Sequence, residues 1–409
     1  MSYAVAMLSV HTSPLALAGS VKDAGGMNVY IRELARELGR LHVTVDIFTR
    51  RTQPDQPTIV TLAPRVRVVH IDAGPAAPVS KHELSQYVPA MARQIERFAR
   101  CEKIRYDLVH SHYWLSGMVG LQLAQRWQVP HLTMFHTLAH LKQLANPAEV
   151  EAPLRLEMER QLIQQADRII ATTHDERAQI IRHCGATSGQ VEVIPCGVDL
   201  QRFQASYRQE ARVRLGLKLD QPVLLFVGRL DPFKGPDLFL KAAAMMQKKA
   251  QLVIVGGNAA GDPEITKLRQ LASDLRIAKR VHFLGARPQE QLSLIYSAAD
   301  VTVVPSYHES FGMAAVESLA CGTPVVATRA GGLMTVVQHG ATGYLVQRCP
   351  GFFAERLDSL LRYPETLEAM RANARASVVQ YSWQSVANQM REVYEDVLYE
   401  ADEDVVALM

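Results

Sequence analysis

The chain has almost no excess charge of either sign and no long hydrophobic run. Its 409 residues include 44 basic and 41 acidic side chains, which give a net charge of +3 without any dense block of Lys or Arg. We therefore expect no nucleic-acid partner. No stretch approaches the length of a membrane span, and the first residues lack the basic region of a signal peptide. These absences predict a cytoplasmic protein without an integral membrane segment.

Cysteine is scarce. The five cysteines are odd in number, scattered along the chain and free of Cys-x-x-Cys spacing. This pattern argues against structural zinc and indicates a reducing compartment.

Short β-branched runs alternate with amphipathic segments in two successive series. Apolar residues recur at helical spacing over residues 27–38 and again over 385–399. Such alternation predicts an α/β fold with parallel sheets covered by helices on both faces. The predicted strands are residues 5–10, 43–48, 66–71, 108–110, 132–135 and 168–171 in the first series, and 223–227, 252–257, 281–285, 301–304 and 325–327 in the second.

Turn residues without a long periodic element mark a domain boundary near residue 200. The chain is long for one hydrophobic core, so two domains of ordinary size are expected. We predict a Rossmann-like, doubly wound domain over residues 1–200 and a second over 201–384. The amphipathic segment 385–409 is long enough to return and pack on the first domain.

A glycine pair opens the first predicted helix. Asp-Ala-Gly-Gly at positions 23–26 ends with Gly25 and Gly26, and Asn28 follows. Paired glycines at a helix start let backbone N–H groups approach an anion closely, although a simple glycine turn would also account for them. The loop is not Gly-x-Gly-x-x-Gly, so a nicotinamide cofactor is poorly supported.

Polar side chains follow other strands of the first series, where an α/β sheet binds its ligands. The run His-Ser-His-Tyr-Trp ends at Tyr113 and Trp114, and His136 and Thr137 follow the next strand. A single histidine there is more often structural than catalytic, and the histidine spacing does not form a recognisable metal site. Lys81 and Arg155, ordinary surface cations individually, would together suit a phosphorylated acceptor.

Two cations follow the first strand of the second series. Arg229 and Lys234 are five residues apart in Gly-Arg-Leu-Asp-Pro-Phe-Lys-Gly. An arginine can hold a diphosphate bidentately and a lysine adds a point charge, although basic residues are also common in loops.

Residues 301–326 place two carboxylates around a strand-to-helix junction. Glu309 lies in the loop before the predicted helix and Glu317 lies on it. Backbone N–H groups at a helix start favour an anionic or hydroxylated ligand, and carboxylates beside them accept hydrogen bonds from sugar hydroxyls. The alternative is an N-terminal helix acid and a solvated helix residue.

Together, these motifs resemble the retaining glycosyltransferases of family 4, which have the GT-B fold of two Rossmann-like domains facing across a cleft. The resemblance rests on Gly-Arg-Leu-x-x-x-Lys-Gly at 228–235, on Glu-Ser-Phe-Gly at 309–312 and on Glu317, and it covers essentially the whole chain. The front motif at 23–30 and His-Ser-His-Tyr-Trp at 110–114 narrow it to the branch of sucrose-phosphate synthases and inositol-phosphate glycosyltransferases. Compact cyanobacterial-type sucrose-phosphate synthases are the preferred match.

The resemblance implies a role for each matching position. His136, Arg229, Lys234 and Glu309 would form the catalytic group, with His136 near the reacting carbon of the sugar. The donor would be held by Gly25, Arg229, Lys234, Arg287, Glu309, Phe311, Gly312 and Glu317, and the acceptor by Gly26, Asn28, Lys81, Tyr113, Thr137 and Arg155.

The implied reaction moves glucose from UDP-glucose to fructose 6-phosphate, giving sucrose 6-phosphate and UDP for sucrose biosynthesis. The leaving diphosphate would take the proton of the acceptor hydroxyl, without an enzymic nucleophile, a cofactor or a metal ion. The chain has no room for a phosphatase domain, so a separate sucrose-phosphate phosphatase would act downstream.

Several alternatives stay open. Transfer from UDP-N-acetylglucosamine to inositol 3-phosphate would use the same residues, and ADP or GDP could replace UDP. A nucleotide-sugar epimerase and a non-catalytic sensor of UDP-sugars are the alternatives of other classes.

Overall fold

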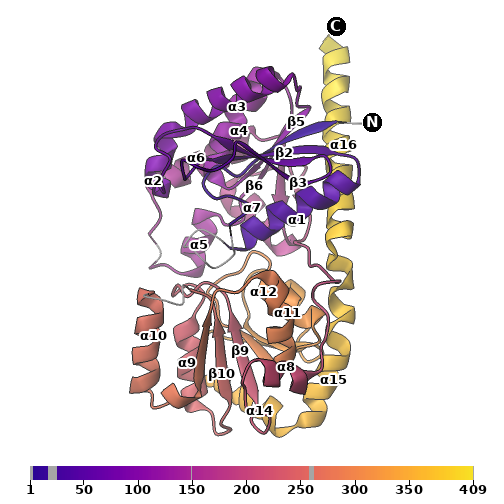
Figure 1. Ribbon diagram of the computed structural model, residues 1–409. Coiled ribbons are helices and arrows are strands. Elements are labelled where there is room, and N and C mark those ends of the chain that lie inside the picture. Colours follow the sequence, from indigo (N-terminus) through magenta and orange to yellow (C-terminus); the bar gives the residue numbers. More distant parts are fainter. Residues whose placement is uncertain (1–2, 17–24, 149, 258–261, 409) are drawn as a thin grey trace. The chain divides into compact units, whose positions relative to one another are not determined.

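The computed structural model describes residues 3–16, 25–148, 150–257 and 262–408, with side chains for all of these except 402 and 404–408. Positions 23 and 24 of the front motif and residue 409 lie outside this set. Contacts divide the chain into two units (Figure 1). The first contains Met27–Pro195, the described residues of Met1–Ala16 and the C-terminal segment from Trp383; the second is formed mainly by Cys196–Ser382. The chain thus passes between the units a few residues before the predicted boundaries at 200 and 384.

The first unit is built on an eight-stranded sheet in the described part of the chain, with the order β3-β4-β2-β1-β5-β6-β7-β8. All neighbours are parallel except β3 and β4, which are antiparallel. The strand order reverses between β1 and β5, and ligands of such sheets bind at this switch point. The strands are β1 (Ala4–Leu8), β2 (Thr44–Arg50), β3 (Ile59–Ala63), β4 (Val66–Ile71), β5 (Leu108–His112), β6 (His131–Met134), β7 (Arg168–Ala171) and β8 (Val191–Val193).

Helices cover both faces of this sheet, with α3 and α4 on one face and α1 on the other (Figure 1). The apolar faces of α3 and α4 share a core with strands β1 and β5. The helices are α1 (Gly26–Arg40), α2 (Lys81–Leu84), α3 (Val88–Glu102), α4 (Trp114–Trp127), α5 (Ala139–Ala145), α6 (Pro153–Gln165), α7 (His174–Cys184) and α16 (Trp383–Leu408), with a 3-10 turn at η1 (Ser85–Tyr87).

The C-terminal helix α16 belongs to the first unit although it follows the second in sequence. The side chain of Tyr394 is fully buried, and its hydroxyl lies 2.6 Å from Nδ1 of His110 on β5. Farther along the helix, Glu400 pairs with Arg168 at 2.5 Å. The helix therefore contributes side chains to the interior of the first unit.

The second unit contains a six-stranded, wholly parallel sheet among its described residues, in the order β11-β10-β9-β12-β13-β14. Its switch point lies between β9 and β12. The strands are β9 (Val223–Val227), β10 (Gln251–Val255), β11 (Val281–Gly285), β12 (Val301–Val304), β13 (Val325–Thr328) and β14 (Gly343–Val346). The helices are α8 (Arg208–Arg214), α9 (Pro236–Met245), α10 (Pro263–Asp274), α11 (Gln289–Ala298), α12 (Met313–Ala320), α13 (Leu333–Val336), α14 (Pro350–Arg362) and α15 (Pro364–Ala374), with 3-10 turns η2 (Ala278–Arg280) and η3 (Ala376–Tyr381).

Three strands were not predicted from the sequence: β3, β8 and β14. Each lies at an edge of its sheet. An edge strand is covered less completely than a central one, so it needs no continuous apolar run. The segment Ile59–Ala63 has no buried residue, and Val191–Val193 has only three residues.

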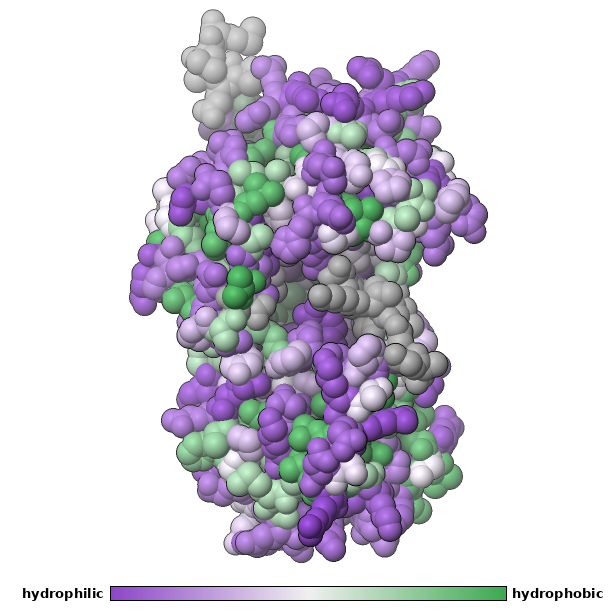
Figure 2. All heavy atoms as spheres, turned by 90° about the vertical axis from the view of Figure 1, so that its left-hand side faces the viewer, coloured by the Kyte–Doolittle hydropathy of each residue, from purple (hydrophilic) through white to green (hydrophobic). Residues whose placement is uncertain are grey.

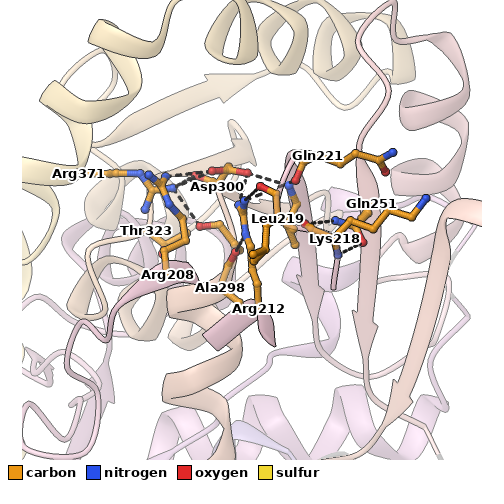
Figure 3. A network of polar contacts seen from close by, with 12 residues as sticks. Arg208, Arg212, Lys218, Leu219, Gln221, Gln251, Ala298, Asp300, Thr323 and Arg371 are labelled. Atoms are coloured by element: carbon orange, nitrogen blue, oxygen red, sulfur yellow. Dashed lines mark hydrogen bonds and ion pairs between the residues drawn. The ribbon is translucent and has the colours of Figure 1, made fainter. Parts of the chain in front are cut away.

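The amino ends of β9 and β12 are joined by a buried charge cluster (Figure 3). The carboxylate of Asp300 accepts hydrogen bonds from Arg212 at 2.6 Å, from Arg208 at 3.1 Å and from the backbone N–H of Val223 at 2.7 Å. Arg371 of α15 adds a contact of 3.3 Å. Because Asp300 immediately precedes β12 and Val223 begins β9, the cluster ties together the two strands that flank the switch point.

One face of the molecule is mixed in polarity. On the face shown in Figure 2, hydrophilic side chains are interspersed with separate hydrophobic ones. Within the described ranges, no helix combines the length and the apolar character needed to span a membrane.

Candidate active site

Two loops at the carboxyl ends of β9 and β12 contain most of the residues predicted to bind the donor. Each loop contains a glycine with positive φ directly before a helix: Gly235, at +76°, precedes α9, and Gly312, at +102°, precedes α12. A Cβ on Gly235 would lie 2.5 Å from the carbonyl oxygen of Pro305, and one on Gly312 would lie 2.8 Å from Leu333. Both turns therefore require glycine.

Lys234 and Glu309 meet across the switch point. The ammonium Nζ of Lys234 lies 2.8 Å from each carboxylate oxygen of Glu309, and the Ser306 hydroxyl donates to Oε1 at 2.7 Å. Burial alone would raise the pKa of Glu309, but the charge and hydrogen bonds of Lys234, helped by Ser306, lower it below the ordinary value. Glu309 is therefore ionised at neutral pH and holds the lysine in place.

Arg229 lies at the start of the same loop as Lys234. Its guanidinium is 3.3 Å from the carboxylate of Asp231, and its side chain is 38% exposed. The backbone N–H of Lys234 donates to the side chain of Asp231 at 3.2 Å. Asp231 therefore links the two cations, and both remain at the end of β9 where a diphosphate would dock.

Glu317 is buried on α12, which excludes the solvated helix residue considered above. It accepts hydrogen bonds from the Tyr296 hydroxyl at 2.9 Å and from the Gln289 amide at 3.4 Å. Burial raises the pKa of Glu317 to about 7, and these hydrogen bonds only partly offset that effect. The carboxyl group is thus poised between its neutral and charged forms near neutral pH, unlike Glu309.

Other positions predicted to bind the donor follow β11 or directly precede α12. Arg287 follows β11, two strands from β9, and is partly exposed. The ring of Phe311 is buried and packs edge-on against Tyr381 with a centroid distance of 5.1 Å. That packing fixes the backbone just before Gly312, the part of the loop that was predicted to bind sugar hydroxyls.

Tyr113 is the centre of the predicted acceptor half. It caps α4 with φ of 75° and ψ of 154°, an unusual conformation for a bulky residue. The Lys81 ammonium lies 5.2 Å from its ring centroid and the Arg155 guanidinium 5.0 Å, while the ring of His11 packs against it at 4.5 Å. Two cations and a histidine from separate elements thus meet at one aromatic ring.

Arg155 is a buried residue rather than the surface cation expected from the sequence. It is 5% exposed and pairs with Glu159 at 2.7 Å and Glu151 at 2.8 Å. Its other terminal nitrogen donates to the backbone carbonyl of Thr137 at 2.7 Å and to the threonine hydroxyl at 3.3 Å. Glu159 lies one turn later on α6 and Glu151 lies just before that helix begins, and their sequence positions alone did not reveal that both would pair with Arg155.

The front motif contributes mainly local structure. Gly26 begins α1 and is exposed, and Gly25 directly precedes it. The Asn28 amide is buried and donates to the Thr12 hydroxyl at 2.8 Å and to the Ser13 carbonyl at 2.6 Å. Asn28 therefore ties the loop after β1 to the start of α1.

His136 follows β6 with a left-handed φ of 58°. Burial lowers its pKa to about 3, so the imidazole is neutral. Its Nε2 lies 3.0 Å from Nδ1 of His112, the last residue of β5. Neither His112 nor His11 was predicted to be a site residue. Alternation along a strand would have revealed one of them, since His110 and His112 are two residues apart and share one face of β5.

Comparisons with known proteins identify the family of this chain. Residues 24–202 match the family described as Glycosyltransferase Family 4, and residues 207–377 match Glycosyl transferases group 1. A protein of Nocardiopsis dassonvillei named D-inositol 3-phosphate glycosyltransferase is 43% identical over 95% of this chain and 94% of its own. One of the same name from Corynebacterium diphtheriae is 41% identical over 97% and 95%. The chain belongs to glycosyltransferase family 4.

A solved structure supports the fold of this glycosyltransferase. Sucrose-phosphate synthase from Thermosynechococcus elongatus is 33% identical, covers 97% of this chain and 100% of its own, and superposes with a TM-score of 0.91. The predicted GT-B fold and the family resemblance are thereby confirmed. The preference for sucrose-phosphate synthase is not confirmed, because the curated relatives above carry the other name.

Proposed function

We propose that this glycosyltransferase moves a sugar, with retention of configuration, from UDP-N-acetylglucosamine to D-inositol 3-phosphate. The observation that carries the proposal is the similarity, 41% and 43% identity over almost the whole chain, to relatives named D-inositol 3-phosphate glycosyltransferase. This was the alternative in the sequence analysis, and it replaces sucrose 6-phosphate synthesis as the main hypothesis.

The cations around Tyr113 support a phosphorylated acceptor. Three nitrogens of Arg155 are engaged by Glu151, Glu159 and Thr137, so Arg155 orders the walls of this region. Lys81 begins α2, and Ser80 caps that helix by accepting from the backbone N–H of Glu83. The fixed start of α2 directs the Lys81 ammonium toward the Tyr113 ring, where it would contribute a point charge to a phosphate.

The donor loops support charge stabilisation as the main catalytic device. When the bond between sugar and diphosphate breaks, negative charge develops on the leaving oxygen, and Arg229 and Lys234 would stabilise it. Glu309 keeps Lys234 positioned in advance, at 2.8 Å. Transfer from the same face of the sugar then needs no enzymic nucleophile, because the leaving diphosphate takes the proton of the attacking hydroxyl.

Fructose 6-phosphate is the second candidate acceptor. It is favoured by the 33% identity and the TM-score of 0.91 to a sucrose-phosphate synthase. Both acceptors combine a phosphate with several hydroxyls, so the contacts around Tyr113 suit either one.

Release of UDP from paired substrates tests the proposal. One mixture contains UDP-N-acetylglucosamine and inositol 3-phosphate, and the other contains UDP-glucose and fructose 6-phosphate. We expect acceptor-dependent release in the first mixture only, and retention is read from the anomeric coupling constant of the product by NMR. Selective release in the second mixture would move the protein to the sucrose-phosphate synthase branch.

The same assay separates the other classes of function. Consumption of UDP-sugar without an acceptor and without UDP release would indicate an epimerase. Tight binding of UDP-sugar without turnover in any mixture would indicate a sensor. Either result would contradict the proposal.

A further inference from the structure

His136 is hydrogen-bonded to a buried histidine of the first unit, His112. Nδ1 of His112 and Nε2 of His136 are 3.0 Å apart, and both residues follow or end neighbouring strands at the switch-point side of the sheet. The ring of Tyr30 lies edge-on to both, at centroid distances of 5.8 Å and 5.3 Å. The pair is therefore held in a fixed geometry by α1.

Both rings are neutral. Burial is the main cause that lowers the pKa of His112 well below its ordinary value, and electrostatic interactions with His110 and His136 lower it further. Burial also lowers the pKa of His136 to about 3. A hydrogen bond between two neutral imidazoles requires that one nitrogen carries the proton and the other presents its lone pair.

The hydrogen-bond partners of the two ring nitrogens of His112 indicate which nitrogen carries the proton. Nε2 of His112 is buried and has no hydrogen-bond partner among the described residues. A buried N–H without an acceptor is rarer in proteins than a buried acceptor without a donor. Nε2 of His112 is therefore the bare nitrogen, and its Nδ1–H donates to Nε2 of His136.

We infer that His112 is a positioning residue that holds His136 in the tautomer protonated at Nδ1, so that His136 offers a hydrogen-bond donor to a sugar hydroxyl and cannot act as a base. The role toward sugar rests on the proposed function. The tautomer itself rests only on the contacts of His112. This assignment agrees with a transfer in which the leaving diphosphate, and not a side chain, takes the acceptor proton.

The first test reads the tautomer directly. In protein labelled with 15N-histidine, the two ring nitrogens of His136 are assigned by the signals that disappear in His136→Gln. We expect a protonated Nδ1 and an unprotonated Nε2. A protonated Nε2 would overturn the inference, and the measurement needs no substrate, so it is independent of whether the proposed reaction occurs.

The second test compares two substitutions of His112. The side-chain amide of His112→Asn can keep a donor near the Nδ1 position, whereas His112→Leu removes it. We expect His112→Leu to lower kcat at least about tenfold with little change in the KM of the acceptor, as loss of one oriented hydrogen bond predicts. His112→Asn should recover kcat to within about threefold of the unsubstituted protein.

A substitution of His131 controls for the effect of removing a buried histidine ring on packing. His131 is also fully buried, and its Nε2 bonds the hydroxyl of Ser111 at 2.8 Å. We expect His131→Asn to leave kcat within about threefold even if the melting temperature falls. Equal losses of kcat in His112→Asn and His112→Leu would mean that His112 acts through packing alone and would overturn the inference.

Discussion

The two ends of β9 and β12 in the second unit use the same kinds of charged residue in different ways. At the amino ends, Asp300 is 7% exposed and contacts three arginines and a backbone N–H. At the carboxyl ends, Lys234 and Glu309 pair in loops, with side chains 23% and 16% exposed.

The difference lies in how fully protein partners already occupy the hydrogen-bonding and charge-pairing capacity of these side chains. A buried carboxylate surrounded by fixed donors has no capacity left for a ligand, and removing it strands the charges around it. A pair in glycine-containing loops at the carboxyl ends can exchange its partner for a ligand with little change to the sheet. We therefore expect the amino end to support stability and the carboxyl end to support binding and catalysis.

Asp300→Ala should produce the largest effect, and it should be on stability. Breaking the cluster leaves Arg212 buried without its carboxylate, so we expect the free energy of unfolding to fall by about 3–5 kcal/mol in urea titrations. Turnover per folded molecule at low temperature should be unchanged. Glu368→Ala is the matched control. Glu368 contacts two of the same arginines, Arg208 and Arg371, but its side chain is 59% exposed, so its loss should change stability by no more than about 1 kcal/mol. Equal effects of the two substitutions would contradict the assignment.

Lys234→Ala, at the carboxyl end of β9, should lower turnover and leave stability nearly unchanged. Loss of a cation that stabilises the leaving diphosphate should cost about 2.7–4 kcal/mol, which is at least about a hundredfold in turnover, while the fold survives. Steady-state kinetics measures the loss, and circular dichroism checks the fold. The control is Lys241→Ala, an exposed residue on α9 paired with Asp237, for which turnover should be near normal. Near-normal turnover in Lys234→Ala would exclude the assigned role.

Glu317 should give a smaller, pH-dependent effect on stability. Because its pKa is raised to about 7 in the folded protein, the folded state keeps a proton that the unfolded state loses above about pH 4.5. Stability should therefore fall as the pH rises from about 4.5 to 7, by up to about 3 kcal/mol. Glu317→Gln should remove this contribution, which urea unfolding at pH 5 and pH 7.5 would detect.

Glu309 sharpens the contrast with Glu317. The pKa of Glu309 is lowered in the folded protein, because Lys234 stabilises the charged carboxylate. The pairing therefore stabilises the folded state fully when the pH is above the ordinary pKa of a glutamate, and this stabilisation is lost as the pH falls through the lowered pKa of the folded state. Glu309→Gln should change the pH dependence of the free energy of unfolding on the acid side only.

For Glu317→Gln, an unchanged difference in the free energy of unfolding between pH 5 and pH 7.5 would show that another group titrates in that range.

Removal of divalent metal should have the smallest effect. We propose that Arg229 and Lys234 supply the positive charge that some sugar transferases obtain from a metal ion. Within the part of the chain that the structure describes, no group of three or more His, Cys, Asp or Glu side chains is placed to hold one. UDP release should be the same in EDTA and in magnesium. Complete loss in the chelator, restored by magnesium, would contradict this.

The sequence predicted the architecture because buried parallel strands and amphipathic helices have distinct periods. Central strands such as β9 and β12 are continuous apolar runs, and the glycines and charged residues that follow them mark the switch point of the second sheet. The edge strands β3 and β8 were missed because they lack such buried runs, and β14 was missed because its apolar run, Tyr344–Val346, is very short. Family motifs then predicted the donor and acceptor residues.

The chain by itself determined the fold class, the two series of elements and the residues at their strand ends, because these depend on local pattern and short motifs. Only the tertiary structure decided which charges pair. It buries Arg155 between Glu151 and Glu159, gives Glu309 and Glu317 opposite pKa shifts and brings His112 to His136. The physical reason is that burial and hydrogen-bond partners set the protonation state of a side chain. Both depend on tertiary packing, which brings together residues from different segments of the chain.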